Sequence, residues 1–315
     1  MSGSESALPE ARRARLEETY DTVLRPVVEA FYATVRSNED VGPFAGEGLV
    51  GLLTFPNSGT SWFLELTARA SRICNHTVYE PEARTVGGEP HRGVYSLRFP
   101  NAVLPGIDQP SFVKSHMRNY GMAKTRISGR GRFQKALDRW LAAEPANCDR
   151  HVRLVRNPLD NMRARFHLHL KNHVDPAVAD AEDFRAFFRA DLRHYLEWHA
   201  YCDELAAAKP VLSLHYEDLL DSATAAETIG RAMAFAGYRM DGLDIGRALS
   251  VAPPSYSAAN GMPVHLGHFD EDDLYWAAAE IGDWLVLHER IRKAAQGFAA
   301  RLRQAVDDLL GDAAH

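Results

Sequence analysis

Apolar side chains recur at helical spacing near the start of the chain, over residues 8 to 36. They stand three or four positions apart and so share one face of a helix. The positions are Leu16, Tyr20, Val23, Leu24, Val27, Val28, Phe31 and Tyr32. The same spacing predicts helices over roughly 61–72, 128–143, 160–171, 183–207, 223–236 and 270–310. Residues 37–48 are polar and contain glycine, which predicts a loop.

Short apolar runs of another kind are typical of buried strands. They cover residues 49–55, 112–113, 151–155 and 210–214, and each precedes polar residues and, further on, a helical pattern. Strands separated by helices predict an α/β fold with a central parallel sheet flanked by helices. We expect a disordered N-terminus over residues 1–6 and a single domain over residues 7–315.

The parallel sheet also predicts where the chemistry lies. In open α/β sheets, ligands bind outside the carboxyl ends of the strands. In this chain those ends fall at residues 56–62, 114–116, 156–160 and 215–217, where the unusual polar residues are found.

Composition narrows the class of protein. The 315 residues are 46% hydrophobic and 25% charged, as in ordinary globular proteins. A net charge of −6 argues against a nucleic-acid partner, which requires a broad excess of lysine and arginine. No apolar run is long enough to cross a membrane, and the N-terminus lacks a secretory pattern. The three cysteines are far apart in the sequence and none lies in a CxxC motif, which argues against a disulfide framework. These features predict a cytoplasmic protein without a membrane partner.

A candidate phosphate-binding loop follows the first strand. Pro56-Asn-Ser-Gly-Thr-Ser-Trp62 leads directly into a helix, and a helix N-terminus preceded by a tight glycine turn offers converging N–H groups to an anion. The hydroxyls of Ser58, Thr60 and Ser61 can donate to phosphate oxygens. Serine and threonine also cap helices, and glycine makes turns, so a purely structural role stays open. No lysine follows Gly59, so the loop is not a Walker A motif.

The strand-end segments together resemble the PAPS-dependent sulfotransferases, which transfer a sulfuryl group from 3′-phosphoadenosine-5′-phosphosulfate (PAPS). Thr54-Phe-Pro-Asn-Ser-Gly-Thr-Ser-Trp62 is similar to the family's TYPKSGTTW loop. Lys114-Ser-His116 is similar to its KTH, Arg156-Asn-Pro-Leu-Asp160 to its RNPKD, and Tyr216-Glu-Asp-Leu219 to its YEDL. The motifs occur in the family's order, each at the end of a predicted strand.

The resemblance implies a fold and a set of roles. The fold would be the P-loop-containing, nucleotide-hydrolase-like sulfotransferase fold. The loop would bind the 5′-phosphosulfate through Asn57, Ser58, Gly59, Thr60, Ser61 and Trp62. Trp62 and Tyr216 would border the adenine. Arg156 would pair with the 3′-phosphate and Tyr216 would lie beside the nucleotide. Lys114 would donate to the transferred group, and His116 would remove the proton of a hydroxyl or amine acceptor. The products would include adenosine 3′,5′-bisphosphate (PAP), and no metal is implied.

The chain departs from the family pattern at defined positions. Asn57 stands where the cytosolic enzymes carry a lysine that supports the leaving phosphate, and a neutral donor is roughly half as strong as a charged one. Ala164 stands where the family has a serine on the 3′-phosphate. The neighbouring Arg163 and Arg165 either replace that hydroxyl or are solvated helix residues.

Other functions remain open from the sequence. A P-loop-type nucleotide kinase or nucleotidase would need ATP and Mg²⁺, and a catalytically silent nucleotide-binding protein would explain Asn57 and Ala164. Lys114 and His116 argue against the silent protein. Residues 75–110, 117–130 and 172–182 are the expected acceptor loops, and they contain aromatic side chains without a long basic run. These features favour a small-molecule acceptor over a polysaccharide, and a homodimer is left open.

Overall fold

The computed structural model describes residues 9–35, 49–72, 75–77, 85–86, 89–90, 94–96, 111–115, 148, 150–173, 181–251 and 266–312. Two compact units are found in the chain. One contains the N-terminal helices and the C-terminal helix, and the other spans Val35–Phe269. The expected disordered segment 1–6 and the expected helix over 128–143 lie outside the described residues. The expectation of one domain over residues 7–315 stays a prediction.

The described part of the terminal unit consists of helices. Helices α1 (Glu10–Thr19) and α2 (Arg25–Thr34) join through a π-helical turn, η1 (Tyr20–Leu24), and pack against α9 (Glu271–Asp312). The ring of Phe31 meets that of Trp284 at 5.4 Å. The predicted helix over 8–36 is confirmed over residues 10–34, with one change of pitch. Pro26 has no N–H to donate one turn back, which gives a physical reason for a wider turn just before it.

The second unit contains a parallel sheet in the order β5-β2-β6-β1-β7-β8. The four predicted strands are confirmed as β1 (Leu49–Thr54), β6 (Ser111–Ser115), β7 (Arg150–Val155) and β8 (Val211–His215). They are adjacent and parallel, so their carboxyl ends meet at one edge of the sheet. The predicted α/β class with a parallel sheet between helices is therefore confirmed.

Other short strands complete the described sheet structure. Strands β2 (Asn75–Thr77) and β5 (Val94–Ser96) extend the sheet beyond β6, and β3 (Thr85–Val86) and β4 (Glu89–Pro90) form a separate antiparallel pair. Residues 75–110 were expected as acceptor loops. The structure shows that Asn75–Thr77 and Val94–Ser96 are strands and not loops. Strand β2 pairs with β6 and β5 pairs with β2, and this pairing supplies the backbone hydrogen bonds of these short segments.

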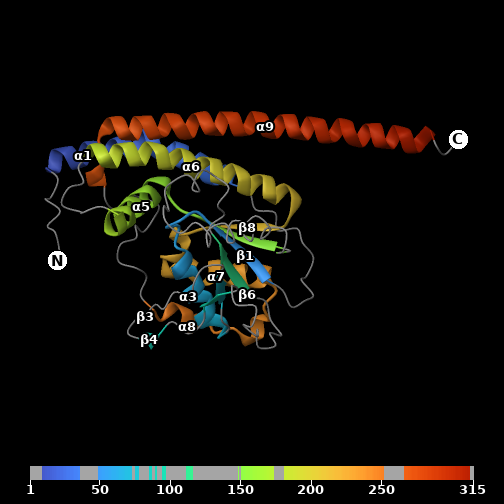
Figure 1. The fold of residues 1–315 in the computed structure, drawn as a ribbon, viewed down its shortest axis with the longest axis horizontal. Coiled ribbons are helices and arrows are strands. Elements are labelled where there is room, and N and C mark those ends of the chain that lie inside the picture. The colour runs from blue at the N-terminus through green and yellow to red at the C-terminus, as the bar shows by residue number, and fades with distance from the viewer. Residues whose placement is uncertain are drawn as a thin grey trace. The chain divides into compact units, whose positions relative to one another are not determined.

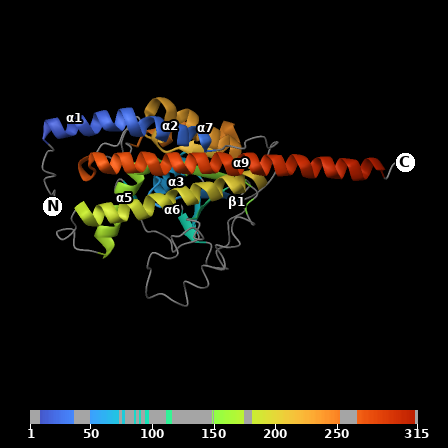
Figure 2. The same cartoon turned by 90° about the horizontal axis from the view of Figure 1, so that it is seen from above.

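Helices lie on both faces of the sheet. Helices α5 (Pro158–His173) and α6 (Ala181–Ala208) cover one face, and α3 (Thr60–Ser71), α7 (Ser222–Ala236) and α8 (Ile245–Leu249) cover the other (Figure 1). Figure 2 looks onto the α5 and α6 layer. The core on the α3 and α7 face is apolar, with Phe63 against Phe112 at 5.0 Å and Leu52, Val152 and Leu212 fully buried.

The face toward α6 contains buried charge. Arg153 of β7 pairs with Asp203 of α6 at 2.8 Å and donates to the Ser213 hydroxyl at 2.9 Å. Removing either partner would leave a buried charge uncompensated, which makes this pair costly to break. Among the described helices, none has the length and apolar character needed to span a bilayer.

Candidate functional site

The site lies where the chain changes direction across the sheet. After β1 the chain enters α3 on one face, and after β7 it enters α5 on the other (Figure 1). Strands β1 and β7 are neighbours, so the segments after them diverge at a topological switch point. Ligands of open α/β sheets bind at such points. The two segments are the loop at 55–59 and the segment Arg156–Asn161.

The loop after β1 has an unusual backbone. Ser58 N donates to Phe55 O at 3.1 Å, which closes a tight turn. Asn57 has φ 67° and Gly59 has φ 88°, both in the left-handed region. Asparagine is one of the few residues with a side chain that adopts this region readily. Asn57 is therefore compatible with the turn, whatever its side chain does.

Gly59 is required for two reasons. Its φ favours glycine, and a Cβ at this position would lie 2.0 and 2.1 Å from two ring carbons of Tyr216. No real Cβ tolerates such a contact. The aromatic ring of the β8 segment therefore packs directly against the loop backbone, and only glycine permits that approach.

Helix α3 begins at Thr60, directly after the turn. The first hydrogen bond of the helix runs from Phe63 N to Gly59 O at 3.0 Å, so the N–H groups of residues 60–62 precede it. Such N–H groups, with the positive end of the helix dipole, form an anion-binding position. The Thr60 hydroxyl donates to Thr54 Oγ1 at 2.9 Å, so it faces the strand end. Ser61 is half-buried in the first turn.

Arg156 lies at the carboxyl end of β7, where the sequence predicted it. Its Nη1 donates to the Asn57 carbonyl at 2.7 Å, and its guanidinium lies 4.9 Å from the centre of the Tyr216 ring. The side chain is buried, and Nε has no hydrogen-bond partner among the described residues. The Tyr195 hydroxyl of α6 donates to the Arg156 carbonyl and fixes its backbone. The structure thus brings Arg156, Asn57 and Tyr216 together.

The start of α5 is anchored to the segment after β8. Asn157 Oδ1 accepts from Leu159 N at 3.0 Å and caps the helix, and Pro158 occupies its first turn, where no N–H is needed. Asn157 N donates to Glu217 Oε1 at 2.7 Å. Burial raises the pKa of Glu217 to about 7, and burial raises that of Asp160 to about 6 despite nearby arginines. Both carboxyl groups beside Arg156 therefore bind a proton more tightly than free carboxyl groups do.

Trp62 and Tyr216 are both buried. The Trp62 indole donates to Leu219 O at 3.1 Å, and its ring belongs to the apolar core with Leu64 and Leu219. Tyr216 lies between Gly59 and Arg156. Their predicted place beside an adenine stays a prediction.

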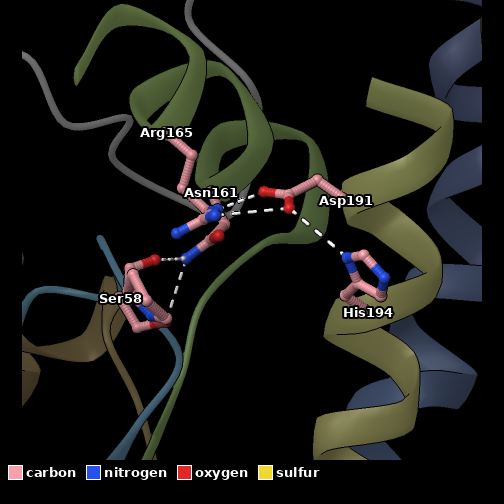
Figure 3. Close-up of polar contacts among 6 residues, drawn as sticks. Ser58, Asn161, Arg165, Asp191 and His194 are labelled. Carbon is pink, nitrogen blue, oxygen red and sulfur yellow. Dashed lines mark hydrogen bonds and ion pairs between the residues drawn. The ribbon is translucent and has the colours of Figure 1, made fainter. Parts of the chain in front are cut away.

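Arg165 of α5 is held by α6. It forms an ion pair with Asp191, with Nη2 3.2 Å from Oδ1, and its guanidinium lies 4.9 Å from the centre of the Phe55 ring (Figure 3). His194 Nδ1 is 3.7 Å from Asp191. The nearby Asp191 carboxylate raises the pKa of His194. Arg165 is thus not the solvated helix residue of the second alternative, because it is paired with Asp191 of α6.

Asn161 joins α5 to the loop. Its Nδ2 donates to Pro56 O at 3.1 Å and to Ser58 Oγ at 2.9 Å (Figure 3). Sequence reasoning missed Asn161, Asp191 and Tyr195, because nothing in their local pattern distinguishes them from other helix residues. Asn157 and Glu217 lie inside the recognised motifs, which was the available signal.

The predicted catalytic residues are only partly described. Lys114 lies in β6, paired in register with Leu52 of β1, so its backbone is at the edge of the site. His116 lies outside the described residues. In the part of the chain that the structure describes, no group of three or more His, Cys, Asp and Glu side chains is arranged to hold a metal ion.

Comparison with known proteins gives a limited result. No protein-family model and no curated protein sequence matches the chain. Among solved structures, the chain is similar to the mouse sulfotransferase SULT7A1 complexed with PAP, at 21% identity and a TM-score of 0.37. The matched region covers 62% of this chain and 61% of the mouse chain.

Proposed function

We propose that this protein is a sulfotransferase that moves a sulfuryl group from PAPS to a hydroxyl or amine of a small-molecule acceptor. One observation carries the proposal. The four sequence segments that resemble the family's motifs follow or end the adjacent parallel strands β6, β1, β7 and β8. These segments are distributed between Thr54 and Leu219 in the sequence. They nevertheless follow strand ends at one edge of the sheet, the edge at which α/β folds bind nucleotides.

The reaction is a single in-line displacement. The acceptor oxygen or nitrogen bonds to sulfur, the bond between sulfur and the bridging phosphate oxygen breaks, and PAP leaves with the electron pair. His116 accepts the proton of the acceptor. Catalysis of this kind consists mainly of positioning and charge stabilisation, as in phosphoryl transfer.

The roles of the loop and of α3 follow from the backbone. The N–H groups of residues 60–62 and the dipole of α3 supply positive potential for the 5′-phosphosulfate. Gly59 lets the Tyr216 ring pack directly against the loop backbone, since a Cβ there would collide with the ring. Asn57 supplies no charge, so Lys114 is proposed to stabilise the leaving group and the transferred sulfuryl.

Arg156 is the proposed ligand of the 3′-phosphate. Its Nη1 is engaged by the loop carbonyl of Asn57, but Nε is buried without a partner among the described residues. Burial raises the pKa values of the nearby Asp160 and Glu217 carboxyls, which reduces the negative charge that competes with an anion for Arg156. Arg163 at the next turn of α5, beside Ala164, is a second candidate.

The finer assignments are proposals as well. The fold would be a single sulfotransferase domain of the P-loop-like class, and Trp62 and Tyr216 would border the adenine. The protein would act in the cytoplasm, as a monomer or homodimer, without nucleic-acid or membrane partners and without a metal.

Ligand identity tests the proposal. PAP should raise the melting temperature by mass action, whereas ATP, which lacks the 3′-phosphate, should do much less. Turnover of labelled PAPS with a panel of phenols and alcohols then measures the activity. If PAP alone and ATP together with Mg²⁺ raise the melting temperature equally, the result would contradict the assignment and favour a kinase or nucleotidase. PAP binding without turnover on any acceptor would favour the silent protein.

A further inference from the structure

Asn161 makes two contacts that no recognised motif accounts for. Its side-chain amide donates to Pro56 O at 3.1 Å and to Ser58 Oγ at 2.9 Å (Figure 3). The side chains of Asn161 and Ser58 are both 0% exposed. A single amide group therefore holds the residues on either side of Asn57.

The residue between these two contacts, Asn57, has a backbone conformation that requires stabilisation. Asn57 has φ 67°, a conformation that residues with a side chain seldom adopt. Its carbonyl accepts from Arg156 Nη1 at 2.7 Å. Three consecutive loop residues are thus bound from one short segment, Arg156–Asn161. The direction in which the following N–H groups point depends on this left-handed turn.

The anchor itself is rigid. Asn161 lies in the first turns of α5, and its N–H donates to Asn157 O at 2.9 Å. One turn further, Arg165 is paired with Asp191 of α6. Asn157 is bound to Glu217 after β8. Asn161 and Arg156 therefore fix the position of the loop after β1 relative to β7, β8 and α6.

Packing alone does not explain an asparagine here. A leucine has nearly the same shape and would fill a fully buried position without the cost of burying an amide. Asn161 Oδ1 accepts no hydrogen bond from the described residues, so the amide carries that cost for its two donor contacts.

We propose that Asn161 is a positioning residue, which holds Pro56–Ser58 in the conformation that binds an anion at the start of α3. The inference rests on the proposed function only for the identity of the anion. Asn161 itself does not touch the ligand. It acts by removing the need for the loop to order when the ligand binds.

Asn75 offers a matched control. It is 1% exposed, and its amide also donates to a backbone carbonyl (Leu64 O, 2.8 Å) and to a hydroxyl (Thr67 Oγ1, 3.3 Å), but these acceptors lie within α3, away from the loop. Asn161→Leu and Asn75→Leu therefore remove equivalent buried contacts. Both should lower the melting temperature, but only one should change anion binding.

The experiment is calorimetric titration with PAP and with inorganic pyrophosphate, well below the melting temperatures. Asn161→Leu should weaken both ligands by about 5- to 100-fold, the range expected for the loss of buried hydrogen bonds. Asn75→Leu should change them by less than about 2-fold. Ser58→Ala should have a smaller effect, and adding it to Asn161→Leu should cost less than the sum, because the two residues share one contact.

Each outcome decides the matter. Wild-type affinity in Asn161→Leu, or equal losses in both leucine variants, would overturn the inference. If Asn161→Leu does not fold, Asn161→Ala against Asn75→Ala gives the same comparison, and equal losses of affinity in these two variants would overturn it. Binding of pyrophosphate but not PAP by the wild type would remove the proposed function and leave the test of Asn161 intact. Binding of neither ligand would remove both.

Discussion

Gly59→Ala is the sharpest test of the loop geometry. The change adds one methyl group to a residue with φ 88°, facing a buried aromatic ring. It alters no charge and removes no hydrogen-bonding group. Any effect therefore comes from the backbone conformation and from the contact with Tyr216.

The two contributions can be given magnitudes. A left-handed conformation costs a residue with a Cβ roughly 1–2 kcal/mol. The new Cβ would lie 2.0 Å from a Tyr216 ring carbon, whereas carbons in contact rest roughly 3.5–4.0 Å apart. The ring is 2% exposed and has Arg156 on it at 4.9 Å, so it cannot move freely. Overpacking of this kind costs about 1–3 kcal/mol. The expected total is about 2–5 kcal/mol.

Urea unfolding at fixed pH measures this loss, and Gly230→Ala is the control. Gly230 lies inside α7, and nothing lies within 4 Å of a Cβ built there. That change should stabilise the protein by about 0.5–1 kcal/mol, because alanine is the better helix former. In a Tyr216→Ala background, Gly59→Ala should cost only the conformational part, about 1–2 kcal/mol.

The reasoning fails on a specific result. If Gly59→Ala unfolds at the wild-type urea concentration, the loop does not hold a left-handed residue against Tyr216. If the cost is the same with and without the Tyr216 ring, the contact contributes nothing and the backbone alone requires glycine.

Two further predictions concern Glu217 and His116. Burial raises the pKa of Glu217 from 4.5 to about 7, so the folded protein binds this proton more tightly than the unfolded chain. Its contribution to stability is complete below about pH 4.5 and is lost as the pH rises through about 7. Glu217→Gln should therefore flatten the dependence of unfolding free energy on pH over this range, by up to about 3 kcal/mol. Urea unfolding at several pH values measures this, and a pH dependence equal to that of the wild type would disprove it. His116→Ala should lower turnover by about 10²–10⁴ with a weakly acidic acceptor and leave PAP affinity nearly unchanged; near wild-type turnover would exclude His116 as the base.

The recognised motifs of the site were predictable because each is local. A strand, a glycine turn and a helix start within a few residues fix the loop at 56–62, and the runs before Arg156 and Tyr216 mark strand ends in the same way. Their contacts were not predictable. Arg156 binds the Asn57 carbonyl across 99 positions and Asn161 reaches Pro56 across 105, and no periodicity links residues so far apart.

The sequence by itself determined the long helices that the structure describes, the four central strands and their parallel arrangement, because the spacing of apolar side chains reports which faces are buried. Tertiary structure decided the strand order and the addition of β2 and β5, since short polar strands form only where a neighbour supplies their hydrogen bonds. It also decided that Arg165 is bound by Asp191 and that Asn161 holds the loop. Those roles depend on which elements pack beside α5, and the local sequence around a residue does not predict which distant elements it will contact.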